Sequence, residues 1–268
     1  WQGEDIGQYL DDLAAKVENN DKIDLFLNST ISATTGSLGN FVSTITTAGN
    51  DKTASVEHGA TILTTGGKEF KPNSYLYGEH PDVLTHLDMD KAMDADDPRI
   101  TDAKSVVFIQ CVESRDEHHP YCSKVCCTHS LKSALEVKKR NPKAKVFILY
   151  RDIRSYGFRE DLYKTARENG IIFIRFDLEN GPEVKSGPDN NLMVKVVDHV
   201  LRLPIKISPG LLVLASGIVP EDNQKLFELF RVPVNDEGFL VEAHAKLRPV
   251  DFASDGLFVA GLAHYPKP

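Results

Sequence analysis

The spacing of apolar positions divides the chain into a β-rich beginning and a later alternating α/β part. Residues 4–17 carry apolar side chains at helical spacing, which predicts a helix. A short apolar run at residues 23–27 predicts a strand. Residues 31–63 hold short β-branched runs separated by glycine-containing turns, so we expect a β-meander there. Residues 69–102 are polar and proline-punctuated, and we interpret them as a connector with a short helix near residues 89–93.

From residue 105 onward, strand patterns alternate with helix patterns. Apolar runs at residues 106–109, 145–150 and 171–176 predict strands, and a continuous run such as the last is typical of a strand covered on both faces. Helical spacing between them predicts helices at residues 123–140 and 158–168. Strand–helix–strand–helix–strand is the mononucleotide-binding half of a doubly wound sheet.

The last third of the chain continues with short elements. The pattern predicts a second small meander at residues 193–207, a buried strand at 211–215, a helix near 222–231 and a final strand at 257–261. The 268 residues suffice for one large or two ordinary domains. We therefore expect an α/β protein, in which residues 69–102 connect two lobes.

All four cysteines of the chain, Cys111, Cys122, Cys126 and Cys127, lie in one stretch. The first follows the strand predicted at residues 106–109, and Pro120 precedes the second, where we expect the helix to start. On that helix Cys122 and Cys126 would face the same side, with Cys127 roughly 100° further round. Thiolates gathered at a strand end and a helix N-terminus suit a metal centre, because the positive end of the helix dipole favours negative charge.

Three chemistries are open for these thiols. An iron–sulfur cluster needs four thiolates and tolerates irregular spacing, whereas structural zinc sites usually pair C-x-x-C knuckles, which this chain lacks. Inert buried or disulfide-bonded cysteines are the third possibility, although a disulfide between Cys126 and Cys127 would be strained. The spacing favours the cluster over zinc and over inert thiols.

The dinucleotide-binding glycine motif is absent, and the place where it would stand after Ile109 holds the first cysteine instead. Arg151 and Arg154 follow the second strand of the unit, where an arginine could bind phosphate, but surface arginines are the favoured interpretation. With neither this motif nor a C-x-x-C redox pair, an NAD(P)H disulfide reductase is a weak hypothesis.

Charge and hydropathy exclude some classes of protein. A net charge of −8 argues against a general nucleic-acid role, and no apolar run approaches the ~20 residues of a membrane span. Without a recognisable secretory signal, we expect a cytoplasmic protein. The chain begins with Trp1 and ends at Pro268 soon after an apolar run, so we interpret it as a piece of a longer polypeptide.

The cysteine stretch resembles the sequence signature of the A-type subunit of heterodisulfide reductase. The resemblance rests on CVESR from Cys111 and HPYCSKVCC from His119. It also rests on YRDIRSYG from Tyr150, on EAHAKLRPV from Glu242 and on AGLAH from Ala260. The similar stretches extend over nearly the whole chain, and related subunits occur in quinone-interacting oxidoreductase complexes of sulfate reducers.

The resemblance implies an FAD/NAD(P)-binding, thioredoxin-reductase-like fold of two lobes with three-layer sheets, in which residues 1–75 and 218–268 belong to the FAD-binding lobe and residues 76–217 to the lobe that carries the cysteine loop. It implies a 4Fe–4S cluster on Cys111, Cys122, Cys126 and Cys127. It also implies that two segments approach FAD, namely Thr64, Thr65, Gly66 and Gly67 and, near the chain end, Gly261, Leu262, Ala263 and His264. Lys132 would lie between cluster and flavin and stabilise reduced flavin, although a solvated helix face is an equal interpretation. His118 and His119 are interpreted as structural or exposed.

The chain also departs from the family pattern. The family's FAD phosphate loop would precede Trp1, and the cysteines of its ferredoxin-type clusters are absent, so this piece alone could lack FAD or activity. The first hypothesis is an electron-transfer module that passes electrons between FAD and the cluster to partner subunits, with a homodimer left open. The alternative is a non-catalytic structural or docking domain whose cysteines hold zinc or nothing.

Overall fold

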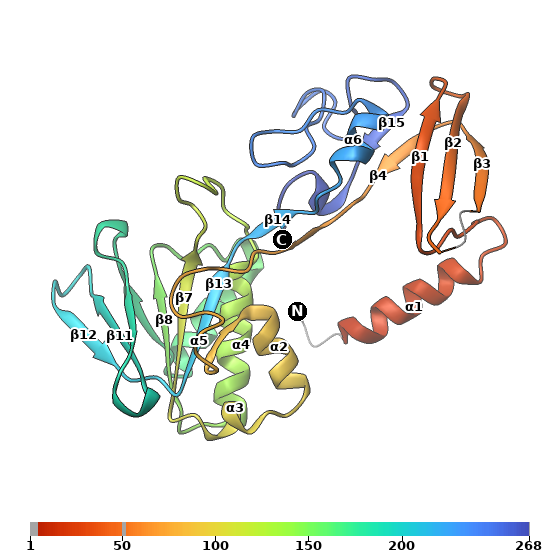
Figure 1. Cartoon of the computed structure of the whole chain (residues 1–268). Helices are drawn as coiled ribbons and strands as arrows, with labels where there is room; N and C mark the ends of the chain where they lie inside the picture. The colour runs from red at the N-terminus through yellow and green to blue at the C-terminus, as the bar shows by residue number, and fades with distance from the viewer. Residues whose placement is uncertain (1–4, 50–51, 268) are drawn as a thin grey trace. The chain divides into compact units, whose positions relative to one another are not determined.

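The computed structural model describes residues 5–49 and 52–267, which form two compact units (Figure 1). The first unit combines the residues up to Leu63 with Asn223–Pro233 and Val241–Val259. The second combines Thr64–Asp222 with Val234–Leu240 and the residues from Ala260 onward. We expected the division at residues 75 and 217, whereas the observed units change at residues 63 and 222, and two later segments return to the second unit.

The first unit contains the predicted meander. Strands β1 (Ser29–Thr35), β2 (Phe41–Thr47) and β3 (Thr53–His58) pair antiparallel in that order, and β4 (Thr61–Leu63) pairs parallel with β15 (Leu257–Val259). Helix α6 (Gln224–Phe230) belongs to the same unit. The predicted meander is confirmed, and so are the helices predicted at residues 4–17 and near residues 222–231.

Helix α1 (Ile6–Glu18) begins after Asp5, whose side chain accepts a hydrogen bond from the N–H of Gln8. Residue 4, where the predicted helix began, lies outside the described residues. The strand predicted at residues 23–27 was wrong. Asn20 accepts hydrogen bonds from the backbone N–H groups of Lys22 and Ile23, so local turn contacts replace a ladder there.

A five-stranded parallel sheet forms the centre of the second unit. Its order is β6 (Val83–Thr85), β13 (Leu211–Ser216), β7 (Ser105–Val112), β8 (Lys145–Tyr150) and β9 (Ile172–Arg175). All six residues of β13 are buried, as expected for a strand covered on both faces. The predicted strands at residues 106–109, 145–150, 171–176 and 211–215 are thereby confirmed.

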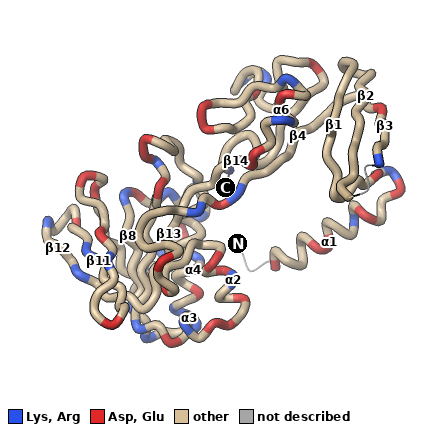
Figure 2. The backbone as a smooth tube through the Cα atoms, viewed as in Figure 1, with Lys and Arg blue, Asp and Glu red and all other residues tan. Residues whose placement is uncertain are grey.

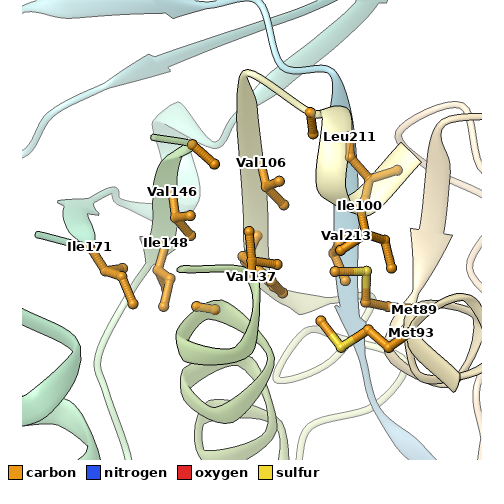
Figure 3. Packing of buried hydrophobic residues seen from close by; sticks show 14 of the residues in the cluster. Met89, Met93, Ile100, Val106, Val137, Val146, Ile148, Ile171, Leu211 and Val213 are labelled. Carbon is orange, nitrogen blue, oxygen red and sulfur yellow. The ribbon is translucent and has the colours of Figure 1, made fainter. Parts of the chain in front are cut away.

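One face of this sheet carries helices α2 (His86–Asp94), α3 (Pro98–Asp102), α4 (Cys126–Arg140) and α5 (Glu160–Glu168). Figure 3 shows how Val106, Val146 and Val213 of the strands meet Val137 of α4 and Met89 of α2. Alternate strand residues point to opposite faces, so this set of side chains covers one face only.

The other face packs against an antiparallel sheet of β10 (Glu183–Ser186), β11 (Leu192–Val197) and β12 (Pro204–Ile207). Val107 and Leu212 of the central strands join Leu192, Val194 and Ile207 in this second core. Helices, parallel sheet and meander therefore form three layers. Burying apolar side chains contributes ~25 cal/mol per Å² of area removed from water, so the cores on both faces stabilise the central sheet.

The order of the strands places a topological switch point between β7 and β13. The chain runs outward through β7, β8 and β9, and then returns to add β13 on the other side of β7. In open α/β sheets, ligands bind at the carboxyl ends of the strands at such a point. Cys111 lies near the end of β7, and Ser216 ends β13, so this edge of the sheet carries the cysteine stretch.

Acidic and basic residues are interspersed along both units (Figure 2). None of the helices within residues 5–49 and 52–267 has the length and apolar character that crossing a membrane requires.

Candidate functional site

The four cysteines line one cavity at the switch point. Cys111 comes from β7, Cys122 from the following loop, and Cys126 and Cys127 from the first turn of α4. The remaining lining residues are small polar or cationic: Ser114, Arg115, Ser123, Lys124 and Arg154. All four cysteines have free thiols, as the prediction of a shared thiolate site requires.

A β-bulge aims Cys111 into this cavity. Gln110 pairs with Ala215 and Val112 pairs with Ser216, so Cys111 is the extra residue of the ladder. Its φ of 58° is positive. Positive φ recurs at Glu113 (46°) and Arg115 (60°) but not at the residues between them. The backbone therefore leaves the regular strand geometry at alternate residues where the cysteine loop begins.

Contacts over long sequence distances hold the loop after β7 in place. The Glu113 carboxylate accepts hydrogen bonds of 2.8 Å from the N–H groups of both Asn73 and Ser74. The Tyr121 hydroxyl donates to the carbonyl of Ile218 at 2.8 Å, and the N–H of Ile218 donates to Ser123 Oγ at 2.7 Å. The cysteine loop is therefore fixed to β14 (Ile218–Pro220), a strand that pairs antiparallel with β5 (Gly67–Glu69).

The predicted helical spacing of Cys122 and Cys126 was wrong. Helix α4 begins at Cys126, and Lys124 just before it has a φ of 62°, a left-handed conformation that ends any helical path from Pro120. Cys122 reaches the cavity from the loop, where its Sγ accepts the N–H of Lys124 at 3.3 Å. Helix α4 thus begins later than the start expected after Pro120, and no side chain caps its N-terminus at Cys126 and Cys127.

Two arginines and one carboxylate surround the thiols. Arg115 Nη1 lies 3.7 Å from Cys111 Sγ and pairs with Asp152. Arg154 lines the cavity, and its Nε donates to the second oxygen of Asp152 at 3.0 Å. Arg151 points to the loop instead, where it donates to the carbonyls of Ser114 and Arg115 at 2.9 Å and 3.1 Å. Arg151 thus stabilises the loop backbone.

Burial favours the protonated form of the two inner thiols. Burial raises the pKa of Cys127 to about 11, against a hydrogen bond from the Arg154 backbone, and the charges of Cys111 and Cys122 add to the rise. Burial likewise raises the pKa of Cys126, followed by the charges of the other three cysteines. Four thiolates crowded together repel one another, so a bound cationic centre would be needed to ionise them all.

The four thiols line one cavity, but within the described part of the chain no group of three or more histidine, cysteine, aspartate or glutamate side chains is placed to hold a metal ion. Four thiolates are the ligand set of a 4Fe–4S cluster and of a four-cysteine zinc site alike. The kind of metal centre therefore stays a prediction.

The two segments expected to approach FAD meet each other in the second unit. Thr64, Thr65, Gly66 and Gly67 continue from β4, and Gly261, Leu262, Ala263 and His264 continue from β15. A Cβ added to Gly67 would lie 3.4 Å from Leu262 Cβ and 3.0 Å from the carbonyl oxygen of Val219. Gly66 and Gly261 have φ values of 78° and 70°. The backbone of Gly67 thus packs closely against Leu262 and Val219. The contact of these segments with a flavin stays a prediction.

The loop also contacts the residues that follow this second segment. Lys124 Nζ lies 4.4 Å from the centre of the Tyr265 ring, and that ring packs on the His264 ring at 4.4 Å. Tyr121 packs edge-on against Phe239 at 5.3 Å. The cysteine loop and the predicted flavin segments therefore share one region of the second unit.

Lys132 and the two loop histidines have separate places. Lys132 is exposed on α4 and is not among the residues that line the cysteine cavity. His119 Nδ1 lies 3.0 Å from the carbonyl oxygen of Glu113, and its ring packs on Phe70 at 4.7 Å. The backbone N–H of His118 donates to Asp116. The contacts of His119 agree with its interpretation as structural.

Sequence reasoning missed a chain of polar side chains that starts at Gln110, next to Cys111, and runs from the buried interior to the partly exposed Asp90. Gln110 donates to Ser130 Oγ, which lies 2.7 Å from His86 Nε2. The His86 ring stacks on the His129 ring at 4.3 Å between centres. His129 Nε2 lies 2.9 Å from Asp90. Burial, followed by the charge of His129, lowers the pKa of His86 well below its usual value. Its only sequence signal was polar residues at buried helical positions. Arg115, which lines the cavity, and Asp152, which pairs with it, were also missed, although both lie within the motifs noted above.

Comparison with solved structures defines the class of fold. The thioredoxin reductase of T. acidophilum superposes with a TM-score of 0.56 at 14% identity, covering 98% of this chain and 72% of that one. The HOCl-induced flavoprotein disulfide reductase of Escherichia coli gives a TM-score of 0.58 at 13% identity, covering 96% of this chain and 50% of that one. The chain therefore has the fold of the flavin-dependent disulfide reductases, as predicted.

Comparison with curated sequences finds relatives among heterodisulfide reductase subunits. No family model matches the chain. It is 38% identical over 231 residues to the A-type subunit of the H2:CoB-CoM heterodisulfide, ferredoxin reductase of Methanothermobacter thermautotrophicus, covering 79% of this chain and 34% of that subunit. It is 35% identical to the second A-type iron-sulfur subunit of the CoB–CoM heterodisulfide reductase of Methanopyrus kandleri, with the same coverage. The chain is thus related to the A-type subunits of heterodisulfide reductases over about a third of their length, which confirms the resemblance.

Proposed function

We propose that the chain is an electron-transfer part of a heterodisulfide reductase-like oxidoreductase, with a 4Fe–4S cluster on Cys111, Cys122, Cys126 and Cys127. The observation that carries this proposal is the convergence of all four thiols on one cavity at the switch point of the sheet. The name of the Methanopyrus kandleri relative, an iron-sulfur subunit, supports it.

FAD is the second cofactor of the proposal, held by segments 64–67 and 261–264. Together, FAD and the cluster would supply exchange between two-electron and one-electron chemistry. The chain's own part is to hold the two sites close together: Tyr121 and Lys124 of the cysteine loop contact Phe239 and Tyr265 near the second segment. Lys132, exposed on α4, would present its ammonium group to reduced flavin.

The electrons would leave to partner subunits. The relatives are named as subunits of ferredoxin- or hydrogen-linked reductases, so an assembly of several chains is part of the proposal. The physical role of this chain would then be positioning and electrostatics, with cationic side chains and a helix N-terminus facing the thiolates.

The test is iron and acid-labile sulfide per chain after anaerobic purification or reconstitution, with an electron paramagnetic resonance spectrum of the reduced sample. We expect roughly four of each and a reduced-cluster signal. Cys126→Ser should lose the iron, the sulfide and the reduced-cluster signal. Lys139→Gln, an exposed change on the same helix, should keep all three. One zinc per chain, or four free thiols without iron after reconstitution, would instead support a structural or docking domain.

FAD binding is tested separately, by quenching of flavin fluorescence on titration with this chain. Saturable binding that Gly67→Ala weakens, and that Gly181→Ala does not, would support the two-segment site. Equal binding by both variants would remove the segment at residues 64–67 from the proposal.

A further inference from the structure

We propose that Arg115 and Arg154 set the reduction potential of the cluster, by placing positive charge against the thiolates of Cys111 and Cys122. This inference rests on the proposed function, because it presupposes a cluster on the four cysteines. It assigns a task to two side chains whose only sequence-based role was a disfavoured phosphate contact for Arg154.

Both arginines line the cavity that the four cysteines share. Arg115 Nη1 stands 3.7 Å from Cys111 Sγ, within range of a hydrogen bond to sulfur. Arg154 lines the cavity together with Cys122, and its Nε donates to Asp152 at 3.0 Å. Neither side chain is freely solvated, since 21% of the Arg115 side chain and 34% of the Arg154 side chain are exposed.

Asp152 keeps both arginines in place. One of its carboxylate oxygens pairs with Arg115 and the other accepts from Arg154 Nε at 3.0 Å. The carbonyl of the same residue lies 3.9 Å from Cys127 Sγ. A planar guanidinium held on one side by a carboxylate still presents its other N–H groups to the sulfurs, which a flexible lysine would do less well.

The charge balance of the lining determines the direction of the effect. The lining residues Arg115, Lys124 and Arg154 carry three positive charges, and Asp152, which pairs with both arginines, carries one negative charge, so the surroundings are positive on balance. One-electron reduction adds one negative charge to the cluster and its thiolates. Nearby positive charge and hydrogen bonds to sulfur stabilise that reduced state more than the oxidised one, so they raise the reduction potential.

The test is a redox titration of the reconstituted full chain with dithionite as reductant, followed by the reduced-cluster resonance. For Arg115→Gln and Arg154→Gln we expect at least a tenfold lower ratio of reduced to oxidised cluster at the wild-type midpoint, which is ~59 mV for a one-electron couple. Arg202→Gln, the same charge change at an exposed hairpin position, should leave the midpoint unchanged. Normal iron content with unchanged midpoints in both test variants would overturn the inference.

Two further results separate the possible failures. Wild-type chain without iron or sulfide after reconstitution would remove the proposed function itself, and the arginine inference with it. If Arg115→Gln fails to load iron, Arg115→Lys is measured instead: we expect it to load and to recover most of the potential, because it keeps the charge. Failure of Arg115→Lys to load would show that positive charge is not what the site requires of this residue, and would overturn the inference.

Discussion

Ser123 and Ile218, separated by 95 residues, are joined by a hydrogen bond of 2.7 Å from the N–H of Ile218 to the Ser123 hydroxyl. Ser123 is almost completely buried, and it stands between Cys122 and the start of α4. Gly217, next to Ile218, leaves room for this contact, since a Cβ there would lie 3.2 Å from Ser123 Oγ. The end of one central strand thus fixes the loop that follows the other.

Ser123→Ala should destabilise the chain by about 1–3 kcal/mol, because it leaves the buried N–H of Ile218 without a partner. Gly217→Ala should also destabilise it, by pushing Ser123 away. Since the alanine at 123 removes the hydroxyl that the new methyl group meets, the double variant should cost less than the sum of the two. Urea unfolding of the metal-free, reduced chain measures all three. Strict additivity would show that the two residues are not coupled.

Arg151→Gln should loosen the cysteine loop without touching a thiol. The change removes the donors to the carbonyls of Ser114 and Arg115, which a shorter amide cannot reach together. We expect slower iron incorporation and faster proteolytic cleavage between Cys111 and Cys122. Arg159→Gln, on the short helix after Tyr156, is the matched control and should behave as wild type. Equal cleavage rates in the two variants would mean that the loop is held by its other contacts alone.

The central sheet could be predicted because its information is local. The strands β7, β8 and β13 are continuous apolar runs, and α4 keeps Leu131, Ala134 and Val137 at helical spacing on the buried side. Such patterns predict strands and helices whatever elements pack against them, because the apolar side must be buried in every case.

The missed features depend on contacts that the hydrophobic pattern does not show. Strand β10 is a polar Glu-Val-Lys-Ser stretch that pairs with β11 in a hairpin. Helix α4 starts only after the left-handed Lys124, and Ser123 before it is held by its contact with Ile218. The local sequence around Cys122 therefore did not show that the helix begins at Cys126. The cysteine set was predicted, whereas the pairing of Arg115 with Asp152, 37 residues apart, was not.

Gly67→Ala should weaken the pairing of β5 with β14. The added methyl group would stand 3.0 Å from the carbonyl oxygen of Val219 and 3.1 Å from Ile218 Cγ2, which is closer than side chains normally approach. Because β14 also receives the Tyr121 hydroxyl, we expect lower thermal stability, by a cost typical of overpacking, about 1–3 kcal/mol. Gly181→Ala is the control, since its nearest neighbour would be 3.8 Å away. Equal melting temperatures of Gly67→Ala and Gly181→Ala would show that β5 and β14 move apart to fit the methyl group at no cost in stability.

Asp88 should make the stability of the second unit depend on acid pH. It forms a capping box with Thr85 at the start of α2, and its carboxylate also accepts from Tyr77 and Lys71. Burial opposes its ionisation, but the hydrogen bonds from Thr85, Tyr77 and Lys71 outweigh burial and lower the pKa from 3.8 to about 2. A folded-state pKa below the unfolded one gives stability that is complete above about pH 4 and is lost as the pH falls through about 2.

Asp88→Asn removes this contribution at every pH. The difference in unfolding free energy between wild type and variant should be about 1–2 kcal/mol at pH 7, after allowance for solvent screening of a half-buried carboxylate, and should shrink between pH 4 and pH 2. Denaturant unfolding at several pH values measures the difference. Asp161→Asn in the first turn of α5 is the control, because Asp161 is exposed: its difference from wild type should be smaller throughout. A difference for Asp88→Asn that stays constant from pH 7 to pH 2 would show that the loss comes from the shape of the amide and not from the charge of the carboxylate.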